Sequence, residues 1–114
     1  MIDLSMVKAN FYRKNGMYCG FIISGHAGGK YGQDIVCAGV SSAVMLTLNT
    51  ITDFFSSDAD VRVEENKVGL RLKDPQKDDN ARALIFSLEN HLKLLSEEYG
   101  GIEVVVKESK QGSE

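Results

Sequence analysis

The first hydrophobic pattern along the chain predicts two strands joined by a tight turn. Residues 2–12 alternate apolar and polar side chains, with a change of phase between Met6 and Val7 that indicates a β-bulge. The pair Asn15 and Gly16 is typical of a hairpin turn, because both residues tolerate the positive φ that tight turns need. We therefore expect residues 18–24 to form the second strand.

A long uncharged run follows and predicts a helix over about residues 34–55. This segment is apolar nearly all round, which is typical of a helix buried in a core. Its length also suits a membrane span, but its hydroxyl and amide side chains favour a core helix. They are Ser41, Ser42, Thr47, Asn49, Thr50 and Thr52. Gly39 is expected to let a neighbouring element pack closely.

The second half of the chain predicts a hairpin and then a helix and a strand. Residues 59–65 and 67–73 alternate at period two around Asn66. The side chains expected to point inward are Val61, Val63, Val68, Leu70 and Leu72. Residues 77–99 carry an apolar stripe at helical spacing, formed by Ala81, Leu84, Leu88, Leu92, Leu95 and Tyr99. Asp78 and Asp79 favour the start of this helix, Gly100 and Gly101 its end, and residues 102–108 predict a strand.

The resulting order, ββαββαβ, predicts a layered domain of the α/β (α+β) class. Two helices are expected to pack on a five-stranded mixed sheet. At 114 residues, the chain is long enough for one ordinary domain. We assign residues 1–107 to that domain and expect residues 108–114 to form a frayed tail.

Charge and cysteine content narrow the function classes. The net charge of −3 gives no basic footprint for nucleic acid, so no direct nucleic-acid partner is expected. The first residues show neither a cationic leader nor an apolar signal core. We therefore expect a cytoplasmic protein without a membrane partner, whose two cysteines are free thiols in a reducing compartment.

One glycine-rich segment carries candidate chemistry. His26 lies in a loop with Gly25, Gly28, Gly29 and Gly32, and Cys37 follows eleven residues later. If the helix begins at an N-cap just before Cys37, free N–H groups and the helix dipole favour the nucleophilic thiolate. An imidazole within reach can pair with that thiolate and then protonate a leaving amine.

Two residues near Cys37 have candidate supporting roles. Asp34 is the predicted N-cap, and its carboxylate can alternatively orient His26, although a negative charge so close opposes thiolate formation. Ser41 lies one turn after Cys37 and is expected to face the same way. Packing of Cys37 in the core stays an alternative to catalysis.

Two other site types fit the sequence less well. Only three residues separate Gly25 from Gly29, whereas a phosphate-binding P-loop needs four, and Tyr31 stands where that loop has Ser or Thr. The possible metal ligands show no CxxC or HxxxH spacing, so we expect no metal and no cofactor. They are Cys19, His26, Cys37 and His91. Cys19 and His91 are instead expected at a half-buried strand position and at a helix edge.

The segment from His26 to Ser42 resembles the bacterial ribosomal-processing cysteine proteases of the Prp family. The matching motifs are "GHA", the glycine loop and "YGQDIVCAGVSS", and the "EEYGGIEVVV" ending is also similar. The resemblance implies a catalytic dyad of His26 and Cys37, with Asp34 and Ser41 at supporting positions and the glycines forming a loop over substrate.

The same resemblance implies what the protein acts on. The family removes an N-terminal extension from bacterial ribosomal protein L twenty-seven, cutting after an aromatic residue, and works as a homodimer. The expected partners are thus a ribosomal protein with such an extension and a second copy of the chain. The alternative is a non-catalytic peptide-binding or ribosome-assembly module that uses the glycine-rich loop.

Overall fold

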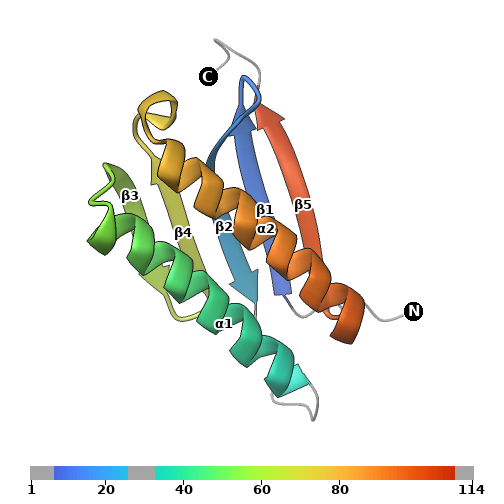
Figure 1. The fold of residues 1–114 in the computed structure, drawn as a ribbon. Coiled ribbons are helices and arrows are strands. Elements are labelled where there is room, and N and C mark those ends of the chain that lie inside the picture. Colours follow the sequence, from blue (N-terminus) through green and yellow to red (C-terminus); the bar gives the residue numbers. More distant parts are fainter. Residues whose placement is uncertain (1–6, 26–32, 110–114) are drawn as a thin grey trace.

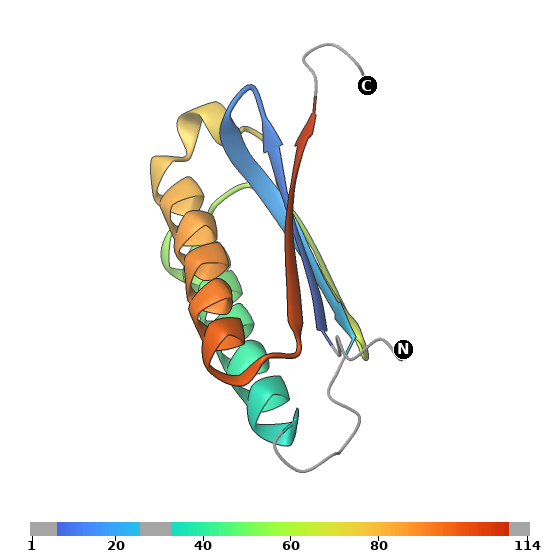
Figure 2. The same cartoon turned by 90° about the vertical axis from the view of Figure 1, so that its right-hand side faces the viewer.

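The computed structural model describes residues 7–25 and 33–109, which form a two-layer domain. Both helices cover one face of a five-stranded sheet, and none of the described residues forms a helix on the other face (Figures 1 and 2). The elements are β1 Val7–Lys14, β2 Met17–Gly25, α1 Gln33–Asn49, β3 Ala59–Glu64, β4 Lys67–Leu72, α2 Asp79–Tyr99 and β5 Ile102–Ser109. A π-helical turn, Thr50–Phe54, extends α1, and a 3₁₀ turn, Pro75–Lys77, precedes α2. The predicted fold class and element order are confirmed.

The sheet is mixed, with strand order β3-β4-β2-β1-β5. β1 and β5 are parallel, whereas the other neighbours are antiparallel. The β1–β2 turn has positive φ at Asn15 (55°) and Gly16 (79°), as the sequence predicted. The register of this hairpin shifts between Tyr12 and Arg13, opposite Cys19. The bulge was predicted between Met6 and Val7, at the start of β1, but the structure places one near the end of that strand. Met6 itself lies outside the described residues.

Helix α1 contradicts the prediction of burial on all sides. One stripe packs on the sheet, formed by Val36, Val40, Val44, Thr47, Leu48 and Ile51. The opposite side is exposed, since Ile35 keeps 56% and Leu46 keeps 70% of its surface in contact with solvent. The reason is architectural: a helix in a two-layer fold has only the sheet and its neighbouring helix to cover it. Residues Ile35–Phe54 are long and apolar enough to cross a membrane, a test that a core helix also passes.

The β3–β4 hairpin confirms the predicted pairing but corrects the predicted burial. Leu70 and Leu72 are buried and Val68 is half-buried, whereas Val61 and Val63 on β3 are exposed. Val61 lies opposite Leu70 in the ladder, so both belong to the same face of the sheet. β3 is an edge strand, however, and the helices cover the sheet less at this edge, so the side chains of β3 stay exposed.

Helix α2 begins where the sequence predicted. The side chain of Asp78 accepts a hydrogen bond from the N–H of Ala81 at 3.4 Å, and Gly100 ends the helix with φ 75°. Most of the predicted stripe is buried or half-buried, but Tyr99 in the last turn is 55% exposed. Leu95 of α2 packs against Gly39 of α1. A Cβ on Gly39 would stand 3.2 Å from Leu95 Cδ2, so the expected close packing at this glycine is confirmed.

Strand β5 extends further than expected. It continues to Ser109, two residues into the segment predicted as a frayed tail. Parallel pairing with β1 continues to its last residue, Lys14, and Glu108 accepts a hydrogen bond from the N–H of Gly16 at 2.9 Å. The tail prediction is therefore wrong for 108–109, and residues 110–114 lie outside the described part of the chain.

Candidate active site

The start of α1, the end of β2 and the β3–β4 turn meet around Cys37. Together they line a partly open cavity of about 170 Å³. Cys37 and Ser41 line it from the helix, Gly25 from the end of β2, and Glu65 and Lys67 from the turn. Figure 1 shows these three chain segments at the same end of the sheet. A half-buried thiol thus lines a small, partly open cavity rather than packing in the core alone.

The start of α1 differs by two residues from the prediction, in which Ile35 is the first helical residue after an Asp34 N-cap. The helix begins at Gln33, so Asp34 is a helical residue rather than its N-cap. Cys37 becomes the fifth helical residue, at the beginning of the second turn. The stabilisation of an anion by a helix N-terminus falls off within the first turn. Cys37 therefore lies just beyond the turn in which that stabilisation is strongest, rather than inside it as predicted.

The backbone around Gly25 is held in place by the neighbouring hairpin. The N–H of Gly25 donates a hydrogen bond to the carbonyl oxygen of Asn66 at 3.0 Å. Gly25 has a φ of 86°, a conformation that glycine adopts without strain. This bond joins the last residue of β2, which precedes His26 in the sequence, to the turn that forms the opposite wall of the cavity.

The predicted site residues fall into two groups. Gly25, Cys37 and Ser41 line one cavity, so the expectation that Cys37 and Ser41 face the same way is met. His26, Gly28, Gly29 and Gly32 lie outside the described residues, as does the side chain of Asp34.

Sequence reasoning missed two parts of the cavity wall. Met45 lines it one turn beyond Ser41, and its spacing of eight residues from Cys37 was a signal for the same helix face. Glu65, Asn66 and Lys67 line it from the β3–β4 turn. Nothing local in the sequence points to these three, because their position depends on β4 pairing with β2.

Comparison with known proteins identifies the family. The sequence pattern of the family described as Cysteine protease Prp matches residues 6–102, which is most of the chain. This protein belongs to the cysteine protease Prp family. The resemblance seen in the sequence is thereby confirmed, and the cavity beside Cys37 is a candidate active site of a cysteine protease.

Individual Prp proteins agree in sequence and in fold. The ribosomal processing cysteine protease Prp of Staphylococcus aureus (strain Mu50 / ATCC 700699) is 31% identical over 80 residues, which cover 68% of this chain and 76% of that protein. A crystal structure of the S. aureus Prp with a covalently linked product peptide has a TM-score of 0.79 and 28% identity, covering 90% of this chain and 100% of the other. A crystal structure of the same protease with a substrate peptide has a TM-score of 0.77 and 25% identity, covering 91% of this chain and 100% of the other.

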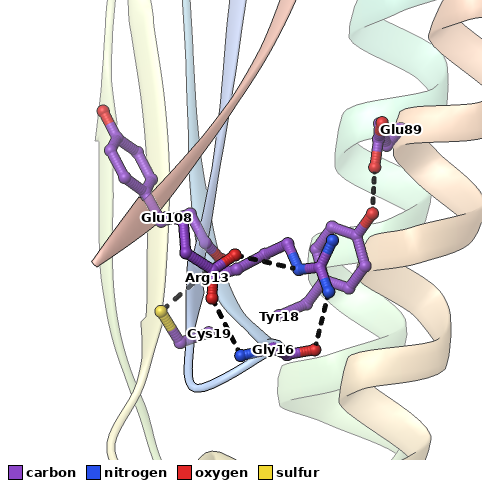
Figure 3. Close-up of polar contacts among 7 residues, drawn as sticks. Arg13, Gly16, Tyr18, Cys19, Glu89 and Glu108 are labelled. Atoms are coloured by element: carbon purple, nitrogen blue, oxygen red, sulfur yellow. Dashed lines mark hydrogen bonds and ion pairs between the residues drawn. The ribbon is translucent and has the colours of Figure 1, made fainter. Parts of the chain in front are cut away.

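A second polar cluster in this Prp-family chain lies at the opposite end of the sheet, around the β1–β2 turn (Figures 1 and 3). Arg13 contacts Glu108 at 3.5 Å and lies over the ring of Tyr18, and the Tyr18 hydroxyl donates a hydrogen bond to the carboxylate of Glu89. The cluster joins β1, β2, β5 and α2. It is distant from Cys37 and therefore stabilises the fold rather than taking part in the site.

The remaining candidate ligands do not gather. Cys19 is half-buried, its Sγ lies 3.5 Å from the carbonyl oxygen of Tyr12, and burial raises the pKa of its thiol. His91 is exposed on α2. Within residues 7–25 and 33–109, no three His, Cys, Asp or Glu side chains are arranged to hold a metal ion.

Proposed function

We propose that this protein is a ribosomal-processing endopeptidase that removes the N-terminal extension of bacterial ribosomal protein L twenty-seven. Membership of the Prp family supports the reaction class, and the S. aureus relative described as a ribosomal processing protease supports the substrate class. The observation that carries the proposal is the cavity shared by Cys37 and Gly25, the residue that precedes His26. The proposal includes a cytoplasmic homodimer that works without a cofactor.

The proposed mechanism uses Cys37 as nucleophile and His26 as general acid and base. The Cys37 thiolate attacks the scissile carbonyl carbon and forms a C–S bond. Collapse of the tetrahedral intermediate breaks the C–N bond while the imidazolium of His26 gives its proton to the leaving amine. His26 then takes a proton from water, which attacks the thioester; breaking the C–S bond releases the acid product and restores the Cys37 thiolate beside the imidazolium of His26.

A cleavage assay with three variants tests this function. The substrate is a synthetic peptide that spans the junction between the extension and the mature protein, and mass spectrometry identifies the products. We expect one cut, after an aromatic residue. Cys37→Ala and His26→Ala are each expected to lower kcat/KM by about a thousandfold or more, as removal of a nucleophile or its base does in other covalent proteases.

Cys19→Ser is the matched control, because it removes the other thiol, which lies at the far end of β2 from the cavity. It is expected to keep nearly full activity. Cleavage that survives Cys37→Ala would rule out Cys37 as the nucleophile. If the parent cleaves neither the peptide nor the intact ribosomal protein, the peptide-binding module becomes the better description.

A further inference from the structure

The cavity beside Cys37 extends along α1 to a methionine. Cys37, Ser41 and Met45 are spaced by four residues and all line it. With a rise of about 1.5 Å per residue, Met45 lies about 12 Å along the helix axis from Cys37. The Cα–Cβ bonds of a helix tilt toward its N-terminus. The side chains of Cys37 and Met45 therefore lean the same way, and the flexible Met45 lines the cavity at the opposite end from Cys37.

The inner surface of the cavity is apolar. Val40 and Val44 line it from α1, and Ile23 and Val68 line it from the sheet. Ile23 and Val68 are direct partners in the β2–β4 ladder, so they form one continuous patch under the helix. Among the described lining residues, the polar side chains are those of Ser41 and of Glu65, Asn66 and Lys67 in the β3–β4 turn, beside the Cys37 thiol. Such a lining favours an apolar side chain and disfavours a charged one.

The volume sets an upper limit on what fits. An apolar protein cavity of about 150 Å³ is enough to bind benzene, and the cavity beside Cys37 measures about 170 Å³. This volume matches one aliphatic side chain or one aromatic ring, and a fused ring system exceeds it. The hydrogen bond between Gly25 and Asn66 fixes the two strand ends that form its walls, whereas Met45 is the flexible part of its boundary on α1.

We propose that Met45 is a specificity-determining residue that limits the substrate side chain next to the scissile bond to the size of a single ring. The inference rests on the proposed protease function, in which Cys37 attacks the adjoining carbonyl. A side chain that enters the cavity from that carbonyl and runs along α1 meets Met45 at the end opposite Cys37. Shortening Met45 lengthens the cavity, and a larger residue there shortens it.

The test compares substrates within each variant. Peptides that differ only in the residue before the scissile bond carry Ala, Phe or 2-naphthylalanine. In Met45→Ala we expect the kcat/KM ratio of naphthylalanine to Phe to rise about tenfold over the parent protein, and in Met45→Phe we expect the ratio of Phe to Ala to fall by a similar factor. Each ratio is independent of the fraction of folded enzyme, so a loss of stability does not imitate the effect.

Leu46→Ala is the matched control, because Leu46 is the next residue on α1, is 70% exposed and does not line this cavity. It is expected to leave both ratios unchanged. If the ratios of Met45→Ala and Met45→Phe equal those of the parent while all peptides are cleaved, the assignment of Met45 is wrong and the protease function stands.

Alkylation of Cys37 gives a readout that does not depend on proteolysis. N-methyl, N-benzyl and N-(2-naphthylmethyl) iodoacetamide each form a C–S bond with the thiolate and release iodide, and mass spectrometry of digested protein counts the label at Cys37 with Cys19 as internal reference. We expect Met45→Ala to raise the naphthylmethyl to benzyl rate ratio at Cys37 only. If Met45→Ala raises this ratio but the parent protein cleaves no peptide, the proposed protease function is wrong and the assignment of Met45 to the pocket stands. If the ratio is unchanged, the assignment of Met45 is wrong.

Discussion

At the residue scale, the least expected feature is a buried carboxylate. Glu89 on α2 is 4% exposed, and an unpaired charge at such a position would strongly destabilise the fold. It has two partners: the Tyr18 hydroxyl donates a hydrogen bond to it, and the Lys93 ammonium lies 2.6 Å from Oε2 (Figure 3 shows the tyrosine contact). Burial and the hydrogen bond to Glu89 raise the pKa of Tyr18 to about 12. The hydrogen bond from Tyr18 to Glu89 therefore joins β2 to α2 only while the Tyr18 hydroxyl keeps its proton.

Tyr18→Phe is expected to lower the free energy of unfolding by about 1–2 kcal/mol at pH 7, because Glu89 loses a buried hydrogen bond. The sign of the pH effect follows from the raised pKa. The contribution of Tyr18 is fully present below its ordinary pKa of 10.0 and is lost as the pH rises through about 12. The stability gap between parent and variant should thus narrow from pH 10 to pH 12. Guanidinium unfolding at pH 7, 10 and 12 measures it.

Tyr99→Phe serves as the control for this comparison. Tyr99 is the last residue of α2 and is 55% exposed, so its hydroxyl group is not buried against a carboxylate. This variant should leave the unfolding midpoint at pH 7 nearly unchanged. A Tyr18→Phe gap that stays the same up to pH 12 would mean that the hydroxyl's protonation does not matter to the fold.

At the element scale, β2 and β4 approach each other closely at one glycine. A Cβ built on Gly20 would lie 2.3 Å from the carbonyl oxygen of Leu70, which is a backbone atom of β4. Gly20 follows Cys19, the extra residue of the bulge in the β1–β2 pairing. β2 is the third strand of five, and its end forms one wall of the cavity beside Cys37. This contact therefore affects both the fold and the site.

Gly20→Ala is expected to lower the free energy of unfolding by about 3 kcal/mol or more, because the strands must separate to admit the methyl group. Gly69→Ala is the matched control on the facing strand, where the nearest atom to a new Cβ is 3.6 Å away. It should change stability by no more than about 0.5 kcal/mol. Urea unfolding of both variants measures these changes. Equal shifts of the two unfolding midpoints would contradict the close approach of the strands at Gly20.

The elements show where sequence patterns succeed and where they stop. Alternation correctly placed Val61 and Leu70 on one face of the sheet, but it says nothing about which part of a face a helix covers, so Val61 was wrongly expected to be buried. Helical spacing correctly joined Cys37 to Ser41. The rest of the cavity wall comes from the β3–β4 turn, whose nearness to Cys37 depends on a strand order that local patterns do not contain.

At the scale of the whole molecule, the charge balance bears on how a large substrate is captured. The chain has 16 acidic and 13 basic side chains, hence a net charge of −3. Several basic groups are paired at the surface, for example Arg71 with Asp60 at 2.7 Å. For the proposed substrate, a ribosomal protein rich in lysine and arginine, the negative net charge predicts attraction at long range, whereas a short neutral peptide is not attracted.

This attraction predicts different responses to salt for two substrates with the same cleavage site. Because the Debye length falls from about 10 Å at 0.1 M to about 3 Å at 1 M ionic strength, added salt should lower kcat/KM for the intact ribosomal protein severalfold through slower association. The value for the neutral peptide should change little, since its encounter is not steered and the chemical step is shared. Measuring both substrates in one salt series cancels effects on the enzyme itself. Equal responses would show that the negative charge plays no part in capture, and recognition would then rest on contacts close to Cys37.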